Sequence, residues 1–104
     1  MKFINMTPHQ INETVTGSTF APSGDVARVA VSYKQIGEEG GIPLFAPSYG
    51  EVEGLPSPQP DTIYIVSGMV LSAAPADRTD LVAPGDLVRD NDGKPVGCKG
   101  FKVA

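Results

Sequence analysis

Alternation of apolar and polar residues is the clearest pattern along the chain. In residues 26–33, every second position from Ala27 to Tyr33 is apolar, so these side chains fall on one face of an extended backbone. This period of two predicts a β-strand. Shorter apolar runs predict a strand at residues 2–6 and a further one at residues 10–15, after a kink.

A second kind of pattern marks the middle of the chain. Residues 62–66 are β-branched or aromatic and predict a buried central strand. Ser67 follows as a helix N-cap, and residues 68–74 fit about two turns of helix before Pro75. A strand followed directly by a short helix is the only helical unit that the pattern predicts.

Glycine and proline divide the remaining sequence into short pieces. The chain holds 12 glycines and 10 prolines in 104 residues, which disfavours a helical bundle and suits short strands joined by turns. Residues 38–41 predict a turn, and residues 42–46 a return strand whose Pro43 favours a sheet edge. Residues 47–61 predict an extended loop with at most a brief strand, and residues 83–86 predict a turn.

Near the C-terminus, residues 87–89 and 96–98 flank an Asp-Gly turn and predict a hairpin. No linker divides the chain, so residues 1–104 form one expected domain. The expected fold is mainly β (α+β): a small mixed or antiparallel sheet, or a partly open barrel, with one short helix after the strand at residues 62–66.

Charge and composition narrow the possible partners. Eight basic residues against twelve acidic ones give a net charge of −4, which disfavours DNA and RNA because nucleic-acid binding needs clustered Lys and Arg. A single cysteine, Cys98, excludes an intrachain disulfide and fits a reducing cytoplasm. No apolar run approaches the ~18 residues of a membrane span. We therefore expect a cytoplasmic protein, and its thin core favours a homo-oligomer.

The residue inventory also disfavours most catalytic and metal chemistry. One histidine and one cysteine are too few for a zinc site, and no glycine-rich phosphate loop or serine elbow is present. We expect no cofactor, no metal and no catalytic residue. His9 and Cys98 could form a nucleophile pair if the fold joined them, but structural roles are the favoured interpretation.

A possible anion site is the strongest chemical signal. Ser67 and Gly68 would offer backbone amides at a helix start, and arginine guanidinium groups are suited to phosphate. A tyrosine or histidine ring could stack on a base. A plain helix cap and internal ion pairs are the alternatives. The candidate ligand-binding residues are Thr7, His9, Arg28, Tyr64, Ser67, Gly68, Arg78 and Arg89.

Several segments together resemble a family of small uncharacterised proteins of tailed phages, prophages and bacterial genomes. The segments that carry the resemblance are Asn5–His9, Pro22–Gly24 with Ala27–Val29, Gly54–Pro56, Asp61–Ser67 and Leu81–Asp90. The resemblance implies a phage setting, where small acidic proteins often counter host defences. It supplies no catalytic residue.

Three functions are compatible with this setting. The first is a non-catalytic anti-defence protein that sequesters a nucleotide immune signal, such as a cyclic nucleotide or an ADP-ribose derivative, as a homo-oligomer in the host cytoplasm. The second is a phage structural or assembly protein, or an inhibitor that binds a host protein, without a small-molecule ligand. The third is an enzyme that uses His9, Cys98 or the carboxylates.

Overall fold

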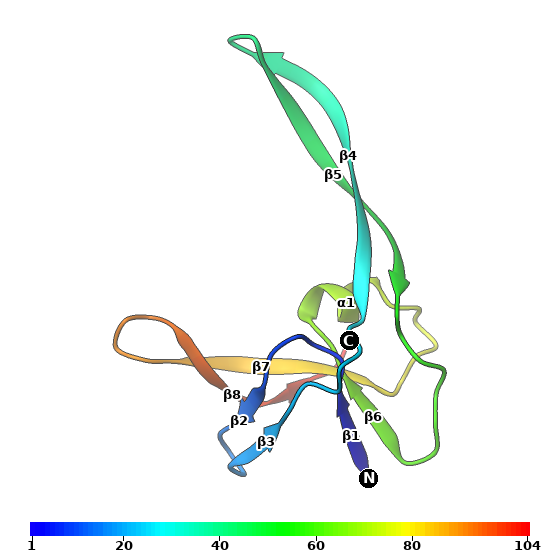
Figure 1. Cartoon of the computed structure of the whole chain (residues 1–104), viewed down its shortest axis with the longest axis vertical. Helices are drawn as coiled ribbons and strands as arrows, with labels where there is room; N and C mark the ends of the chain where they lie inside the picture. The colour runs from blue at the N-terminus through cyan, green and yellow to red at the C-terminus, as the bar shows by residue number, and fades with distance from the viewer.

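Six strands form a nearly closed mixed sheet, and two longer strands form a separate ribbon that projects from it (Figure 1). The computed structural model describes all 104 residues. It confirms the expected fold class: mainly β, a partial barrel, and one short helix after the predicted central strand. In chain order the elements are β1 (Lys2–Asn5), β2 (Ile11–Glu13), β3 (Ser18–Phe20), β4 (Arg28–Glu39), β5 (Ile42–Glu53), β6 (Thr62–Ile65), α1 (Gly68–Ala73), β7 (Leu81–Arg89) and β8 (Pro95–Lys102).

The sheet has the strand order β1-β6-β7-β8-β2-β3. Strands β1, β6 and β7 run parallel, β8 returns antiparallel to β7, and β2 pairs with β8 in parallel through Glu13 and Cys98. The two edges then approach one another. Asn5 on β1 forms a bridge to Pro22, and the rings of Phe3 and Phe20 lie 5.5 Å apart. These contacts make the sheet a partial barrel.

The helix covers one side of this sheet. It lies in the crossover between the parallel strands β6 and β7, and its Val70 and Leu71 are buried. Ser67 caps the helix as predicted, because its Oγ accepts a hydrogen bond from the backbone N–H of Val70 at 3.2 Å. The main core consists of Met6, Ala27, Tyr64, Val66, Val70, Leu71, Leu81 and Ala83. Only 14 of the 104 residues are buried, so the core is small for the chain.

The ribbon of β4 and β5, which we call the arm, stands away from the barrel (Figure 1). Gly40 and Gly41 close its tip with φ angles of 59° and 81°, a left-handed pair suited to a tight hairpin turn. The arm explains the extended shape of the molecule. The radius of gyration is 16.5 Å, against about 13 Å for a compact chain of this length.

One sequence prediction near the arm is wrong. The predicted loop at residues 47–61 begins only after Glu53, because β5 continues through Pro47. Proline is tolerated there because a two-stranded ribbon gives each strand an unpaired edge, where a missing N–H breaks no ladder. The short strand β3 (Ser18–Phe20) was also not predicted.

The predicted turn at residues 83–86 is also wrong. Strand β7 passes straight through it, with Pro84 paired to Phe101 on β8. Gly85 was expected in a turn, but it lies within β7 where that strand approaches β8 closely. A Cβ added there would lie 2.5 Å from the carbonyl oxygen of Lys99 and 2.9 Å from that of Gly100, so only glycine permits this close strand approach.

Candidate functional site

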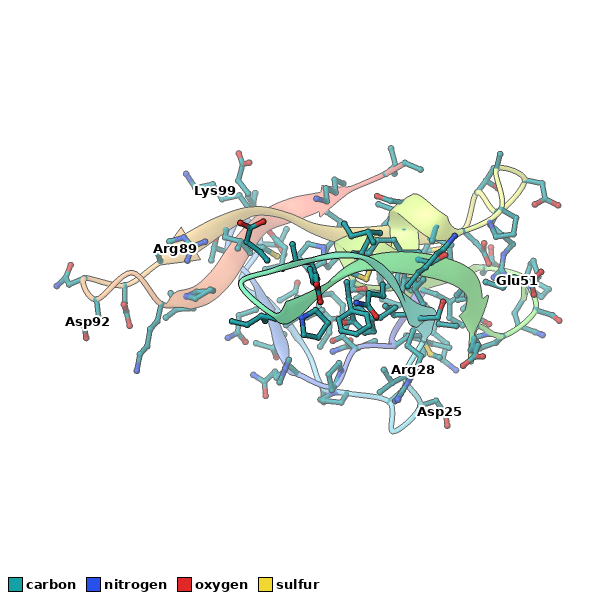
Figure 2. The ribbon with its side chains drawn as sticks, turned by 90° about the horizontal axis from the view of Figure 1, so that it is seen from above. Asp25, Arg28, Glu51, Arg89, Asp92 and Lys99 are labelled. Carbon is teal, nitrogen blue, oxygen red and sulfur yellow. The ribbon has the colours of Figure 1, made fainter.

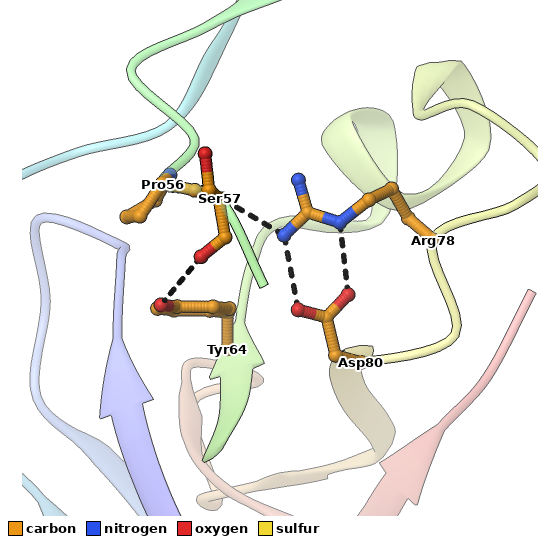
Figure 3. A network of polar contacts seen from close by, with 5 residues as sticks. All are labelled: Pro56, Ser57, Tyr64, Arg78 and Asp80. Atoms are coloured by element: carbon orange, nitrogen blue, oxygen red, sulfur yellow. Dashed lines mark hydrogen bonds and ion pairs between the residues drawn. The ribbon is translucent and has the colours of Figure 1, made fainter. Parts of the chain in front are cut away.

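Arg78, one of the predicted anion-binding residues, is engaged within the fold. Its Nε lies 2.9 Å from Asp80 Oδ1, and its Nη2 donates to Asp80 Oδ2 at 3.0 Å and to the carbonyl oxygen of Pro56 at 2.9 Å (Figure 3). The hydrogen bonds from Arg78 lower the pKa of the Asp80 carboxyl below its usual value. This guanidinium group therefore fastens the proline-rich segment to the start of β7.

Tyr64, a predicted stacking residue, belongs to the same network. Its ring is buried in the main core, and its hydroxyl donates to the carbonyl oxygen of Ser57 at 3.2 Å (Figure 3). Together with Arg78 it holds residues 56 and 57 against the barrel. A buried ring cannot stack on a base without rearrangement of this core.

The other two arginines do not converge on a common site. Arg28 lies at the base of the arm, opposite Glu53, whereas Arg89 lies near the end of the β7–β8 hairpin, well apart from Arg28 (Figure 2). The Nη1 of Arg89 donates to the carbonyl oxygen of Gly93 at 2.8 Å, within its own hairpin. The three guanidinium groups thus stand in three separate places.

The start of the helix serves the helix itself. The side chain of Ser67 accepts from Val70, and its carbonyl oxygen accepts from the backbone N–H of Leu71 at 2.9 Å. The helix has six residues, beginning at Gly68. We interpret Ser67 and Gly68 as a structural cap.

Thr7 and His9 lie in a loop that a buried asparagine organises. Asn5 Nδ2 donates to the carbonyl oxygens of His9 at 2.8 Å and Phe20 at 3.0 Å, and its Oδ1 accepts from both Thr7 N and Thr7 Oγ1. Every hydrogen-bonding position of this amide is used. The organising role of Asn5 was not predictable from the sequence, because a polar residue at a strand end resembles an ordinary turn residue.

A shallow hollow of about 490 Å³ lies beside His9. Its polar side chains are the imidazole of His9 and the neutral amides of Gln10 and Asn12. Gln10 Nε2 donates a hydrogen bond to Asn12 Oδ1 at 2.9 Å. No arginine or lysine lines it. The volume suits a small molecule, but the lining offers no charge to hold an anion.

Cys98 also borders this hollow, although its residue surface is only 1% exposed. Burial raises the pKa of the thiol above its ordinary value, and the nearby carboxylate of Glu13 adds to this effect. A nucleophilic cysteine needs the opposite environment, in which the thiolate is stabilised and accessible. The fold thus gives Cys98 the surroundings of a core residue.

The most distinctive surface is one face of the arm. From the base to the register shift after Gln35, the cross-strand pairs on this face are Val29–Val52, Val31–Tyr49, Tyr33–Pro47 and Gln35–Phe45. Seven of these eight residues are apolar and none is charged. The pair Glu38–Pro43 follows beyond the shift, at the tip. Tyr33 is 70% exposed and Phe45 is 53% exposed. We call this set the apolar face of the arm.

The opposite face of the arm has a different character. Its cross-strand pairs are Arg28–Glu53, Ser32–Ser48, Lys34–Ala46, Gly37–Leu44 and Glu39–Ile42. Charged and small side chains predominate and suit contact with water, and the exposed Leu44 and Ile42 lie near the tip. The arm is therefore an amphipathic ribbon, but the barrel covers its apolar face only at the base, where Val29 and Val52 pack on the main core.

A notch continues the apolar face onto the helix. It has a volume of about 350 Å³ and is lined by Val29, Tyr49, Met69, Ser72 and Ala73. Met69 on α1 is 53% exposed, although it points into this apolar setting. Exposed apolar side chains thus extend from Met69 on α1 along the arm to Phe45.

The sequence predicted an apolar face on this strand but not whether the face is buried or exposed. Alternation from Ala27 to Tyr33 correctly predicted the strand and its apolar face. A strand that faces a core and a strand that faces a partner have the same period of two.

Comparison of the chain with protein-family models, with curated proteins and with solved structures finds no match. The one helix is too short to cross a membrane. No group of three or more His, Cys, Asp or Glu side chains is placed to hold a metal ion.

Proposed function

We propose that this chain is a non-catalytic protein-binding module that attaches to its partner through the apolar face of the arm. The observation that carries the proposal is the exposure of Tyr33, Phe45 and Tyr49 on one uncharged face. Contiguous apolar patches of this kind mark interaction surfaces, because leaving them in water has a free-energy cost.

The shape of the arm supports the same proposal. A two-stranded ribbon is marginally stable alone in water, and the barrel supports only the base of this one. The unpaired edges of β4 and β5 also leave backbone donors and acceptors free. A protein partner that covers the apolar face would stabilise the arm.

The resemblance to phage and prophage proteins suggests where such a module would act. It favours an assembly component, or an inhibitor that occupies the surface of a host protein. Aromatic side chains are enriched in interface centres, and the arm carries three of the seven aromatic residues of the chain. Both roles use binding without turnover.

The test is a matched pair of double variants. Tyr33→Ser with Phe45→Ser removes two aromatic rings from the apolar face, whereas Lys34→Gln with Ser48→Asn alters the opposite face. Each is expressed in phage-infected host cells and purified through a tag. We expect a stoichiometric protein partner, which includes untagged copies of this chain, with wild type and the second variant only. Equal recovery with both variants would contradict the proposal.

A second candidate is the sequestration of a small anionic ligand, such as a cyclic nucleotide or an ADP-ribose derivative. The hollow beside His9 favours it, because about 490 Å³ is within the usual range for small-ligand sites. Its neutral lining means that an anion would need cationic groups from a second subunit. Isothermal titration with cyclic dinucleotides and cyclic ADP-ribose tests it, and the absence of heat from all of them would exclude it.

A further inference from the structure

We infer that the partner of the apolar face is a second copy of this chain, with the two arms packed face to face and antiparallel about a two-fold axis. This inference rests on the proposed function and names the partner. In this arrangement the tip of each arm enters the notch between the arm and α1 of the other copy.

The area of the exposed surface fits such a dimer. Four residues of the apolar face are at least 41% exposed: Val31, Tyr33, Phe45 and Tyr49. Together they present on the order of 500 Å² per chain, more than half of the ~800 Å² that each partner buries in a stable interface. The apolar face therefore supplies most of the area that a two-fold interface needs.

The chemistry of the face suits a copy of itself. A two-fold interface places the same patch on both subunits, so the patch must be complementary to itself. The apolar face meets this condition because none of its side chains is charged, so packing against a second copy brings no like charges together. Edge-to-edge pairing into a four-stranded sheet would leave Tyr33 and Phe45 exposed, so face-to-face packing is the arrangement that covers them.

Charge at the tip sets the direction. Glu38 and Glu39 lie next to the Gly40–Gly41 turn. Parallel arms would bring four of these carboxylates together, and like charges at close range are unfavourable. Antiparallel arms place each tip at the base of the other arm instead.

The two ends of the apolar surface then match. At the tip, this face carries Pro43, which alternates with Phe45 along β5, and at the base it carries the notch lined by Tyr49 and Met69. A two-fold axis near the middle of the arm places each tip in the other notch, so this contact forms twice. Tyr33 and Phe45 lie near the axis, where aromatic residues contribute most to binding.

Sedimentation tests the dimer. Interfaces of this size bind in the micromolar range or tighter, so at about 100 µM the wild type should sediment at twice its chain mass. Tyr33→Ser with Phe45→Ser should weaken association at least about 100-fold. Lys34→Gln with Ser48→Asn should leave association unchanged. Both targets of the first variant are exposed, and circular dichroism checks that it folds.

Disulfide trapping tests the geometry. All variants carry Cys98→Ala. A mixture of the Pro43→Cys and Met69→Cys chains should form a cross-linked heterodimer on mild oxidation, although these positions are roughly 20 Å or more apart within one chain. Pro43→Cys mixed with Asp92→Cys is the control and should not cross-link. Pro43→Cys pairing with itself would overturn the antiparallel arrangement.

The outcomes separate the two proposals. A wild-type monomer at about 100 µM overturns the dimer. If wild type then copurifies with a different protein that the aromatic variant does not recover, the proposed function survives without the dimer. If the chain is monomeric and the aromatic variant changes nothing, both proposals fail.

Discussion

The carboxylate of Glu13 joins three parts of the barrel. It accepts hydrogen bonds from the backbone N–H groups of Val15, Thr16 and Gly100, at 2.6, 2.9 and 3.0 Å, and another from the Thr16 hydroxyl. These donors, the Thr16 side chain first, lower the pKa of Glu13 to about 2 from an ordinary 4.5. The ionised form is therefore the one that holds the β2–β3 turn to β8.

This ionisation predicts a specific pH dependence. The folded pKa lies below the unfolded one, so Glu13 stabilises the fold above about pH 4.5 and loses this effect as the pH falls toward 2. Glu13→Gln should lower the urea midpoint near neutral pH, because its amide NH₂ would face backbone donors. It should also flatten the decline of stability between about pH 5 and pH 3. An unchanged decline would contradict the assignment, and Asp80 supplies the remaining slope.

Arg78 predicts an effect on stability and not on binding. Arg78→Ala should lower the free energy of unfolding by about 2 kcal/mol, because Asp80 and the Pro56 carbonyl lose a shared donor. The stability of Arg78→Lys should lie between those of wild type and Arg78→Ala, since an ammonium group cannot form the paired hydrogen bonds of the guanidinium. Urea unfolding measures both. Wild-type stability in Arg78→Ala, or loss of self-association at wild-type stability, would argue against this structural role.

The burial of Cys98 predicts how fast its thiol reacts. A buried thiol with a raised pKa should react with Ellman's reagent only when the chain opens, so labelling should be slow in the native protein and complete in urea. Val96→Cys in a Cys98→Ala background is the matched control, because Val96 lies on the same strand and is 49% exposed. Equally fast labelling of both native proteins would contradict the burial of Cys98.

Strands β7 and β8 approach closely at Gly85. The predicted effect of Gly85→Ala is a loss of several kcal/mol of stability, since the new Cβ would meet backbone oxygens that cannot move independently. Gly37→Ala on the arm is the control, because a Cβ there meets nothing within 4 Å. Thermal unfolding compares the two. Similar midpoints would mean that the strands can separate at no cost.

Individual elements show how far the sequence was informative. The strand at residues 62–66, its Ser67 cap and the hairpin around the Asp-Gly turn were predictable, because each depends on local propensity. Strand β7 was not, because Pro84 and Gly85 have turn-like identities and the reason for the glycine lies on β8. Strand β3 is only three residues long and depends on its pairing with β2.

The candidate site was less predictable than the fold. The sequence contains residue types that suit anions, but only tertiary contacts decide whether they converge. Arg78 is held by Asp80, and Arg28 and Arg89 stand on different elements. The apolar face of the arm was visible as alternation, yet its exposure depends on where the whole ribbon points.

At the scale of the molecule, the barrel holds the core and the arm carries the proposed binding surface. The barrel supplies a small core of its own, and the arm projects about 40 Å of ribbon, judged from its 12-residue strands. The base of the arm is anchored in that core by Val29 and Val52. Local opening of the arm should therefore be easier than opening of the barrel unless a partner covers it.

Hydrogen–deuterium exchange across the arm tests this account most directly. In wild type at high concentration, amides that pair β4 with β5 should be protected to an extent comparable with the barrel, and dilution should remove this protection from the arm alone. Tyr33→Ser with Phe45→Ser should exchange like the dilute wild type at every concentration. Arm protection that is independent of both concentration and the aromatic residues would contradict the account.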